Sequence, residues 1–388
     1  MAMISDFETS SDIAYCTIIT KSHLSYARTL ATTLETSNSQ NKLYVLLADR
    51  VDGYIDPDKE PFHLISLEEL TDREDINKMC FYYTPSELCF CLRAWLHEYM
   101  FQKTIFKKWI YLDSDIIVCH SLEKISDQLD DISIMISPHL ISIDPPRSIN
   151  VKAIRKLESY LLRNGGIYNG GFLALRKTKE SKAFIEWFKN HLKMYGFDDR
   201  PMQSGDQFWL TCVPLYFREV SVLRDPGANL AYWNLFERTI ERDGSGEIKV
   251  NRKPLLFFHF AGFDMNAPNK LSKYGIPQGL KIIPGPIEEL AKDYHRLLIA
   301  NGYEETINYP YAFAKFNNGK SITPLMRRVY FEMVFSEKGF KGSPFEQYEY
   351  FKKRMHLQEI KNKFRNLSKY IMNKIGRYLN PDYNFDRP

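Results

Sequence analysis

The chain has 388 residues, of which 44% are hydrophobic and 26% are charged, and its formal net charge is +4. This composition is typical of a globular protein with one large core and room for a second, smaller unit. It contains no run of about 18 apolar residues, which argues against a membrane-spanning helix. The opening residues, MAMISDFETSSD, lack the basic and apolar segments of a signal peptide, so we expect a cytoplasmic protein.

Strand and helix patterns alternate along the first part of the chain. Residues 13–20 and 42–48 are apolar, β-prone runs, and residues 22–35 between them have helical spacing. Such a βαβ unit predicts an α/β fold with a mostly parallel sheet. Further elements are expected in chain order: a helix over 86–102, strands over 109–112, 116–118, 132–137 and 170–176, helices near 179–195 and 204–212, and a strand within 254–263.

Two aspartates interrupt an apolar run in the stretch WIYLDSDIIVCH, residues 109–120. A buried, unpaired carboxylate is costly, so Asp113 and Asp115 should face solvent, pair with cations or hold a metal ion. Ligands of open α/β sheets collect at the carboxyl ends of strands, and two carboxylates there suit Mg²⁺ or Mn²⁺ with a bound phosphate. His259 is a candidate third ligand, the alternative being a hydrogen-bonded core histidine. A second Asp-x-Asp, at 56–58, lies in a polar loop and is read as solvated surface.

Five motifs follow one another in a particular order: YLDSDIIV, YNGGFLALR, GDQFWL, DPGANLAYWNLFER and FFHFAGFD. This series resembles bacterial glycosyltransferases of the GT-A fold and is similar to the family 8 retaining galactosyltransferases and glycogenin, over roughly residues 12 to 335. The resemblance implies a Rossmann-like, mostly parallel mixed sheet flanked by helices, with a C-terminal helical extension. It also implies a hexosyltransferase that uses Mn²⁺ or Mg²⁺ and a nucleotide-sugar donor, preferably a UDP-sugar.

The resemblance assigns roles to individual residues. Asp113, Asp115 and His259 would bind the metal ion. Gln207 would stand on the reacting face, where an amide favours retention, and Asp206 would contact the donor sugar; inversion would instead make Asp206 or His139 the candidate base. The residues implied in donor binding are Thr17, Thr20, His23, Arg93, Asp113, Ser114, Asn169, Gly170, Gly171, Gly262 and Lys273.

Other assignments are less specific. His139 and Trp233 are candidates for the acceptor side, with a structural role as the alternative for each. The segment after the first strand lacks the acidic and aromatic residues that usually hold uracil, so Thr17, Thr20 and His23 are the available contacts to a base. The lysine that usually follows the His/Gly motif closely is also missing, and Lys270 or Lys273 could replace it.

The C-terminal part has a different character. We expect a catalytic domain over 1–289 and a helical region over 290–388. Residues 351–380 contain nine lysines and arginines against one glutamate, and they carry an apolar stripe at helical spacing. This predicts a helix on an anionic membrane surface, or equally one packed on the main domain, whereas nucleic-acid binding is disfavoured because no recognition module accompanies the charge. The stripe consists of Ile360, Phe364, Leu367, Ile371, Ile375 and Tyr378.

These expectations together predict transfer of a sugar to a glycan or lipid-linked acceptor hydroxyl, in bacterial surface polysaccharide synthesis on the inner face of the cytoplasmic membrane. The alternatives are a nucleotide-sugar hydrolase or protein-modifying glycosyltransferase with the same site, and an inactive sugar-binding or scaffold protein of the same fold. Metal dependence separates the classes, because a scaffold would not need Asp113, Asp115 and His259 together.

Overall fold

The computed structural model describes residues 13–37, 42–142, 151–197, 205–274, 283–336 and 339–355. The chain divides into two compact units, Met1–Ile76 with Pro85–Ala312, and Asn77–Thr84 with Phe313–Pro388. The expected boundary after residue 289 falls inside α9 (Gly285–Ala300), which belongs to the first unit. Both α9 and α10 (Tyr303–Thr306) pack with α1 (Leu24–Ser37). The predicted amphipathic stripe of the tail lies outside the described residues.

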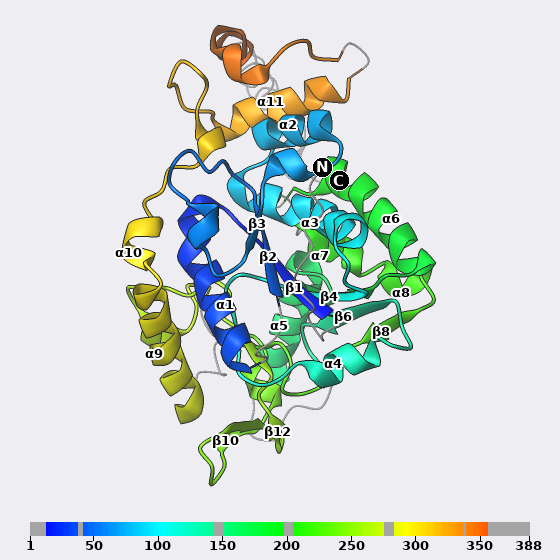
Figure 1. Cartoon of the computed structure of the whole chain (residues 1–388), viewed down its shortest axis with the longest axis vertical. Coiled ribbons are helices and arrows are strands. Elements are labelled where there is room, and N and C mark those ends of the chain that lie inside the picture. Colours follow the sequence, from blue (N-terminus) through cyan, green and yellow to red (C-terminus); the bar gives the residue numbers. More distant parts are fainter. Residues whose placement is uncertain are drawn as a thin grey trace, which may run out of the picture. The chain divides into compact units, whose positions relative to one another are not determined.

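The first unit is built on a seven-stranded sheet with the order β3-β2-β1-β4-β7-β6-β8. β7 is antiparallel to β4 and β6, and the other neighbouring pairs are parallel. This mostly parallel, mixed sheet confirms the predicted fold class (Figure 1). The strands are β1 (Ile13–Ile19), β2 (Lys42–Leu47), β3 (His63–Ile65), β4 (Lys108–Leu112), β6 (Ile134–Pro138), β7 (Tyr168–Arg176) and β8 (Val220–Val222).

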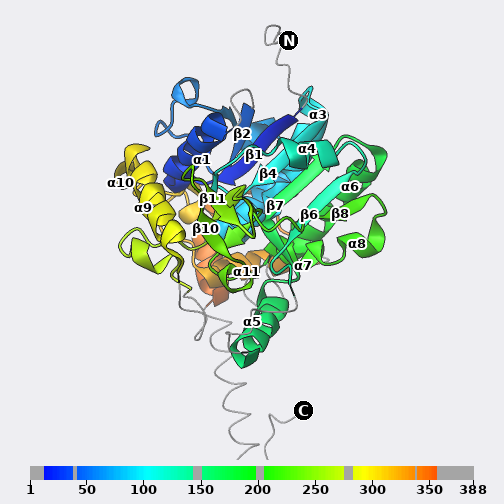
Figure 2. The same ribbon diagram turned by 90° about the horizontal axis from the view of Figure 1, so that it is seen from below.

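Helices cover the sheet, so its central strands are buried on both faces. Every residue of β1, β4 and β6 is buried, which explains why these strands read as continuous apolar runs instead of alternating patterns. α1, α9 and α10 form one group of helices, and α6 packs against α3 (Figure 2). The other helices of the first unit are α3 (Pro85–Lys103), α4 (Glu123–Gln128), α5 (Val151–Asn164), α6 (Lys179–Tyr195), α7 (Gly205–Leu210) and α8 (Val213–Tyr216). α2 (Arg73–Tyr82) spans the division between the units, and α11 (Pro324–Val334) belongs to the second unit.

The strand that follows β4 in sequence belongs to a small second sheet. β13 (Phe257–His259) lies between β5 (Ile116–Val118), to which it is antiparallel, and β9 (Leu230–Ala231), to which it is parallel. Residues 113–115 therefore carry the chain from the large sheet into the small one. The strand expected within 254–263 is shorter than the apolar run, because β13 ends at His259 and a turn follows. A third sheet is antiparallel and consists of β10 (Ile240–Arg242), β11 (Ile248–Val250) and β12 (Lys253–Pro254).

The second unit has an aromatic core and a buried arginine at its centre. The Phe81 ring lies 4.8 Å from that of Tyr330 and 5.1 Å from that of Phe351, centroid to centroid. Arg327 on α11 donates to the carbonyl oxygens of Phe81 (2.6 Å) and Phe313 (2.7 Å), so it ties residues 77–84 to the segment after 312.

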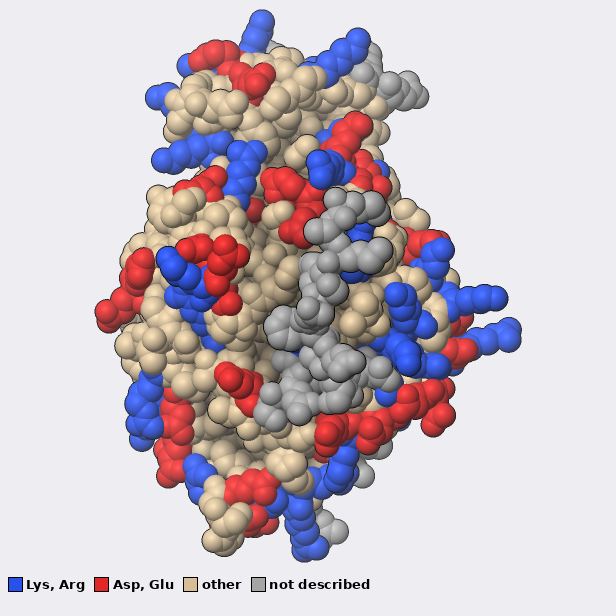
Figure 3. Space-filling model, viewed as in Figure 1, with Lys and Arg blue, Asp and Glu red and all other residues tan. Residues whose placement is uncertain are grey.

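The surface of the described residues shows no segregation of charge on the face seen in Figure 3, where acidic and basic side chains are interspersed. Among the described helices, none combines the length and apolar character needed to cross a bilayer.

Candidate active site

Asp113, Asp115 and His259 converge at the junction of the two sheets. One ligand atom from each lies within 4.8 Å of the others. Nε2 of His259 is 3.1 Å from Oδ1 of Asp115 and 3.7 Å from Oδ2 of Asp113. Two carboxylates and an imidazole form a donor set that fits Mn²⁺ and is compatible with Mg²⁺ through its oxygens. The second Asp-x-Asp, at 56–58, is exposed, as predicted.

Strand pairing explains why these three residues meet. Asp113 and Asp115 follow β4, and His259 pairs with Ile116 across the antiparallel β5–β13 ladder. The N–H of Phe260 donates to the carbonyl oxygen of Asp115 at 2.9 Å, which fixes the backbone of the two segments to each other. The backbone positions of the ligands are therefore fixed by these hydrogen bonds.

Arg93 of α3 links Asp113 to Asp206, a further buried carboxylate. Its Nη2 donates to Oδ1 of Asp113 at 2.5 Å, and its Nη1 donates to Oδ2 of Asp206 and to the carbonyl oxygen of Gly170. The hydroxyl of Tyr111 also donates to Oδ1 of Asp113, at 2.7 Å. Because two donors occupy Oδ1, Asp113 presents Oδ2 toward His259.

The charges of the site shift several pKa values. Burial alone would raise the pKa of Asp115, but His259 beside it lowers the pKa below its usual value. Burial would lower the pKa of His259, whereas Asp115 and then Asp113 raise it above the usual value. Burial raises the pKa of Asp206 to about 6 even though Arg93 opposes the shift. Burial also lowers the pKa of His139 to about 4, so this ring is neutral at pH 7.

Two glycines of β7 allow the close approach of these groups. A Cβ added at Gly171 would lie 2.7 Å from Nδ1 of His259, and one at Gly170 would lie 2.7 Å from Oδ2 of Asp206. Both distances are shorter than real Cβ contacts, so the sequence Gly170-Gly171 is a steric requirement of the site.

Two hydrogen bonds hold the side-chain carbonyl of Gln207 on α7. Oε1 accepts from the N–H of Gly170 and from Nδ2 of Asn169, both at 2.9 Å. Nδ2 of Asn169 also lies 3.3 Å from Nε2 of His139. The structure therefore brings together the residues predicted on β7 and α7, with His139 as a buried neighbour of Asn169.

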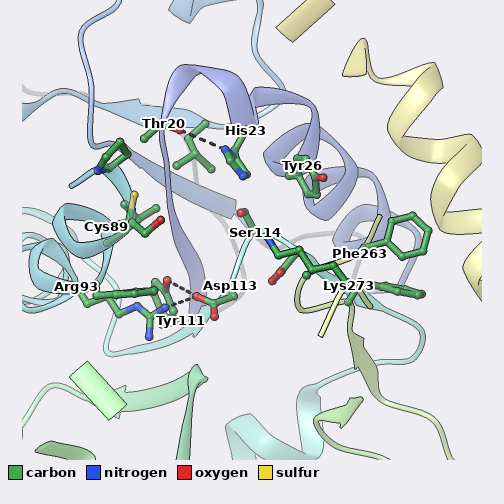
Figure 4. Close-up of a pocket in the computed structure, with 18 of the residues that line it drawn as sticks. Thr20, His23, Tyr26, Cys89, Arg93, Tyr111, Asp113, Ser114, Phe263 and Lys273 are labelled. Atoms are coloured by element: carbon green, nitrogen blue, oxygen red, sulfur yellow. Dashed lines mark hydrogen bonds and ion pairs between the residues drawn. The ribbon is translucent and has the colours of Figure 1, made fainter. Parts of the chain in front are cut away.

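A cavity of about 320 Å³ opens beside the two aspartates. Figure 4 shows Arg93 and Tyr111 bonded to Asp113 at one side, and Thr20 with His23 at the other. Of the two candidate lysines, Lys273 lines the cavity. The predicted donor residues among the lining are Thr20, His23, Arg93, Asp113, Ser114, Gly262 and Lys273.

The wall of this cavity does not include every candidate: Asn169, Gly170, Gly171, Asp206, Gln207, His139 and His259 belong to the hydrogen-bonded group described above, and three others lie elsewhere. Thr17 is buried within β1, and neither it nor Lys270 is part of the cavity wall. Trp233 is buried behind the site, where its ring packs against those of His139 (5.6 Å) and His259 (5.3 Å). Its Nε1 donates to the carbonyl oxygen of His139, so the structure places Trp233 as a support of these histidines.

The sequence interpretation missed several residues of the site. Tyr111 could have been found, because it lies two positions before Asp113 on the same face of the strand. Tyr26 and Phe263 also line the cavity. Tyr26 lies in an amphipathic helix and Phe263 in an aromatic motif, and in both places the sequence does not distinguish a cavity residue from a core residue. Asn229 was missed as well, although its motif was noted; its Nδ2 donates to Oδ1 of Asn169 at 3.2 Å.

Comparison with known sequences identifies distant relatives. No protein-family model matches the chain. It is 23% identical to the uncharacterized protein YfnF of Bacillus subtilis (strain 168) over 265 residues, which are 67% of this chain and 84% of YfnF. It is 25% identical to the uncharacterized protein YfnD of the same organism over 261 residues, which are 66% of this chain and 79% of YfnD.

Among solved structures, the chain is similar to the galactosyltransferase LgtC in complex with donor and acceptor sugar analogs, with 17% identity, 74% of this chain and 95% of that chain covered, and a TM-score of 0.43. It is also similar to the glycosyltransferase GlyE of Streptococcus pneumoniae TIGR4, with 16% identity, 78% and 66% coverage, and a TM-score of 0.42. Both of these solved structures are glycosyltransferases.

Proposed function

We propose that this chain is a metal-dependent glycosyltransferase that moves a sugar from a nucleotide-diphosphate sugar to an acceptor hydroxyl. The observation that carries the proposal is the convergence of Asp113, Asp115 and His259 beside a cavity whose wall includes both aspartates and Lys273. A diphosphate needs two kinds of partner, a divalent cation and a cationic side chain, and this wall offers residues for both. The cavity volume suits a ligand of nucleotide size.

Asp113 Oδ2, Asp115 Oδ1 and His259 Nε2 are the atoms that would hold Mn²⁺ or Mg²⁺, and the ion would stabilise the negative charge that develops on the leaving diphosphate. Residues of the chain shape the cavity and orient the carboxylates. Gly262, at φ +69°, brings backbone into the cavity wall, where a side chain would collide with Tyr274. Arg93 holds Asp113 and Asp206 in fixed orientations, so these carboxylates are preorganised before the donor binds.

Retention of anomeric configuration is the stereochemical part of the proposal. Gln207 is a neutral amide whose oxygen is already engaged by two N–H groups, which makes it a poor nucleophile but a suitable dipole beside a positively charged sugar carbon. Asp206 is paired with Arg93, and His139 is buried, so neither is an available base in this arrangement. The acceptor hydroxyl would then lose its proton to the leaving phosphate. Anomer-resolved NMR of the product tests this, and an inverted product would reassign the base to Asp206 or His139.

A UDP-sugar is the proposed donor and a glycan or lipid-linked hydroxyl is the proposed acceptor, in surface polysaccharide synthesis. Thr20 and His23 stand at the end of the cavity away from Arg93 and are the polar groups there that a base can meet. No carboxylate from the segment after β1 lines that end among the described residues, so the preference for uracil rests on the sequence resemblance. Competition among UDP, GDP, CMP and dTDP in a thermal-shift assay decides the base.

Peripheral association with the membrane is proposed for the basic tail. Its support is the sequence charge of residues 351–380, nine basic residues against one acidic residue. Phe351 is fully buried and stacks on Phe81, so a truncation should follow Met355 to leave the core of the second unit intact. Co-sedimentation with vesicles of anionic lipid tests the proposal, and equal binding by the full chain and the truncated chain would refute it.

The decisive experiment measures sugar transfer or donor hydrolysis with UDP-sugars, with EDTA and with Mn²⁺ added back. The wild type should be active only with metal, and Asp115→Ala should stay inactive at all metal concentrations. Asp58→Ala is a matched control, because it removes an exposed aspartate of the other Asp-x-Asp and should leave activity unchanged. Binding of donor and metal without turnover would instead favour the sugar-binding scaffold.

A further inference from the structure

Two backbone N–H groups fix the orientation of both amide side chains next to His259. The N–H of Gly171 points at one side-chain atom of Asn169 at 3.1 Å, and a backbone N–H can only donate, so this atom is the carbonyl oxygen Oδ1. By the same argument the N–H of Gly170 identifies Oε1 of Gln207, to which Nδ2 of Asn169 donates. Neither amide can be reversed without placing two donors or two acceptors against each other.

This orientation determines which nitrogen of His259 carries the proton. Nδ1 of His259 lies 3.2 Å from Oδ1 of Asn169, and an acceptor oxygen requires a donor there. In the neutral ring the proton is therefore on Nδ1, which leaves the lone pair of Nε2 directed at Asp115 and Asp113. A histidine ligand needs this arrangement to bind a cation through Nε2.

We infer that Asn229 is a positioning residue of the metal site: together with the N–H of Gly171 it holds the oxygen of Asn169 toward His259, and so keeps Nε2 of that ring free for the cation. Nδ2 of Asn229 donates to Oδ1 of Asn169 and to Oγ of Ser137, both at 3.2 Å. Among the described residues the side chain of Asn229 makes no hydrogen bond to a metal ligand and does not line the cavity, so we expect it to act through Asn169. The inference rests on the proposed function, because it concerns the same three ligands.

The setting of Asn229 agrees with this role. The residue is buried, and its backbone has φ +50°, a conformation that asparagine adopts more readily than most residues. Its own Oδ1 is buried without a hydrogen-bond partner among the described residues. Turning the amide would offer this oxygen to the hydroxyl of Ser137 but would set it against Oδ1 of Asn169. The observed orientation therefore leaves Oδ1 of Asn229 without a partner, but it keeps Nδ2 of Asn229 as a donor to Oδ1 of Asn169.

The test combines a spectroscopic readout with metal binding. Asn229→Asp removes the donor at nearly constant volume and tolerates the same backbone, and Asn229→Ala is the second variant if the first fails to fold. Ser137→Ala is the matched control, because it removes the other hydrogen-bond partner of Asn229 and leaves the hydrogen bond from Asn229 to Asn169 in place. Long-range ¹H–¹⁵N spectra of histidine-labelled, metal-free protein, at a pH where the ring is neutral, report which nitrogen is protonated; His259→Gln identifies the signal.

We expect wild type and Ser137→Ala to show the His259 proton on Nδ1, and the Asn229 variants to show it wholly or partly on Nε2. Affinity for Mn²⁺ alone, by titration calorimetry, should fall about 10- to 100-fold in the Asn229 variants, as is usual for residues that orient a ligand. An unchanged tautomer in folded Asn229 variants would overturn the inference, even if Mn²⁺ binding weakened through packing. If the wild type bound no Mn²⁺, the proposed function would fail, while the tautomer spectra would still decide the role of Asn229.

Discussion

Gly171→Ala is a sharp test of the site geometry, because it adds one methyl group at a place where the structure has no room for it. The new Cβ would lie 2.7 Å from Nδ1 of His259 and 2.8 Å from Oδ1 of Asn169. The nearest ring atom, Cε1, would be only 2.4 Å away, whereas an ordinary contact is about 3.5 Å or more, so the His259 ring would have to move by roughly 1.1 Å. The ring is buried, and Trp233 packs against it at 5.3 Å between centroids, so this movement disturbs its neighbours too.

The expected loss of Mn²⁺ affinity follows from how little the distance between a ligand atom and its metal ion can vary. Distances from ligand to metal vary by only about 0.2 Å, so a shift of this size should remove His259 from the ligand set. We expect Mn²⁺ to bind at least about tenfold more weakly, and overpacking should lower the free energy of unfolding by about 1–3 kcal/mol. Titration calorimetry with Mn²⁺ and urea denaturation measure the two effects separately.

Gly285→Ala is the control for this prediction. Its added Cβ would meet nothing within 4 Å, at the first position of α9. This variant should match the wild type in both assays. Wild-type affinity for Mn²⁺ in a folded Gly171→Ala protein would refute the assignment of His259 as a ligand held against β7.

Three further predictions concern single side chains. Lys273→Ala should weaken binding of UDP with Mn²⁺ about three- to fivefold, whereas Lys270→Ala, outside the cavity, should leave the affinity unchanged in the same calorimetric titration. Tyr111→Phe removes the hydroxyl bonded to the first aspartate of the motif and should lower the metal-free unfolding free energy by about 1.5–3 kcal/mol in urea; no change would contradict the 2.7 Å bond. Burial lowers the pKa of His97 to about 3, so the folded chain leaves it unprotonated while the unfolded chain protonates it below about pH 6.5, and its contribution to stability is lost as the pH falls from about 6.5 toward 3. Between pH 7 and pH 4.5 the free energy of unfolding should therefore fall by about 2–3 kcal/mol more in the wild type than in His97→Gln. Parallel pH profiles of the two proteins would refute the lowered pKa of His97.

Local pattern was enough to predict much of the fold. The helix expected over 179–195 is α6, with the same bounds, and the helix expected over 86–102 is α3 with one more residue at each end. Continuous apolar runs correctly marked central strands, because helices cover both faces of the sheet. The helix expected from residue 22 instead begins at Leu24, since a 3-10 turn at Lys21–His23 comes first.

The site was only partly accessible from the sequence. The motif Asp113-Ser114-Asp115 identified itself by interrupting an apolar run, whereas its pairing with His259 came from the order of motifs and depends on the β5–β13 register, which no local pattern encodes. The contact of Asn229 with Asn169 is of the same kind. It joins residues 60 positions apart, beside an irregular β6–β7 pairing whose register shifts between Ile136 and Ser137.

The position of residues 113–115 between two sheets has a consequence for how such a protein can diversify. The three groups that would hold a cation belong to hydrogen-bonded strands or to the link between them, while Phe263, Lys273 and Tyr274 of the cavity wall come from the turns after β13. Substitutions in those turns can reshape the cavity without altering the spacing of the carboxylates and the imidazole. Selection on the choice of substrate and selection on the metal chemistry would then act on separate parts of the chain, and variants made for new donors should begin in the turns.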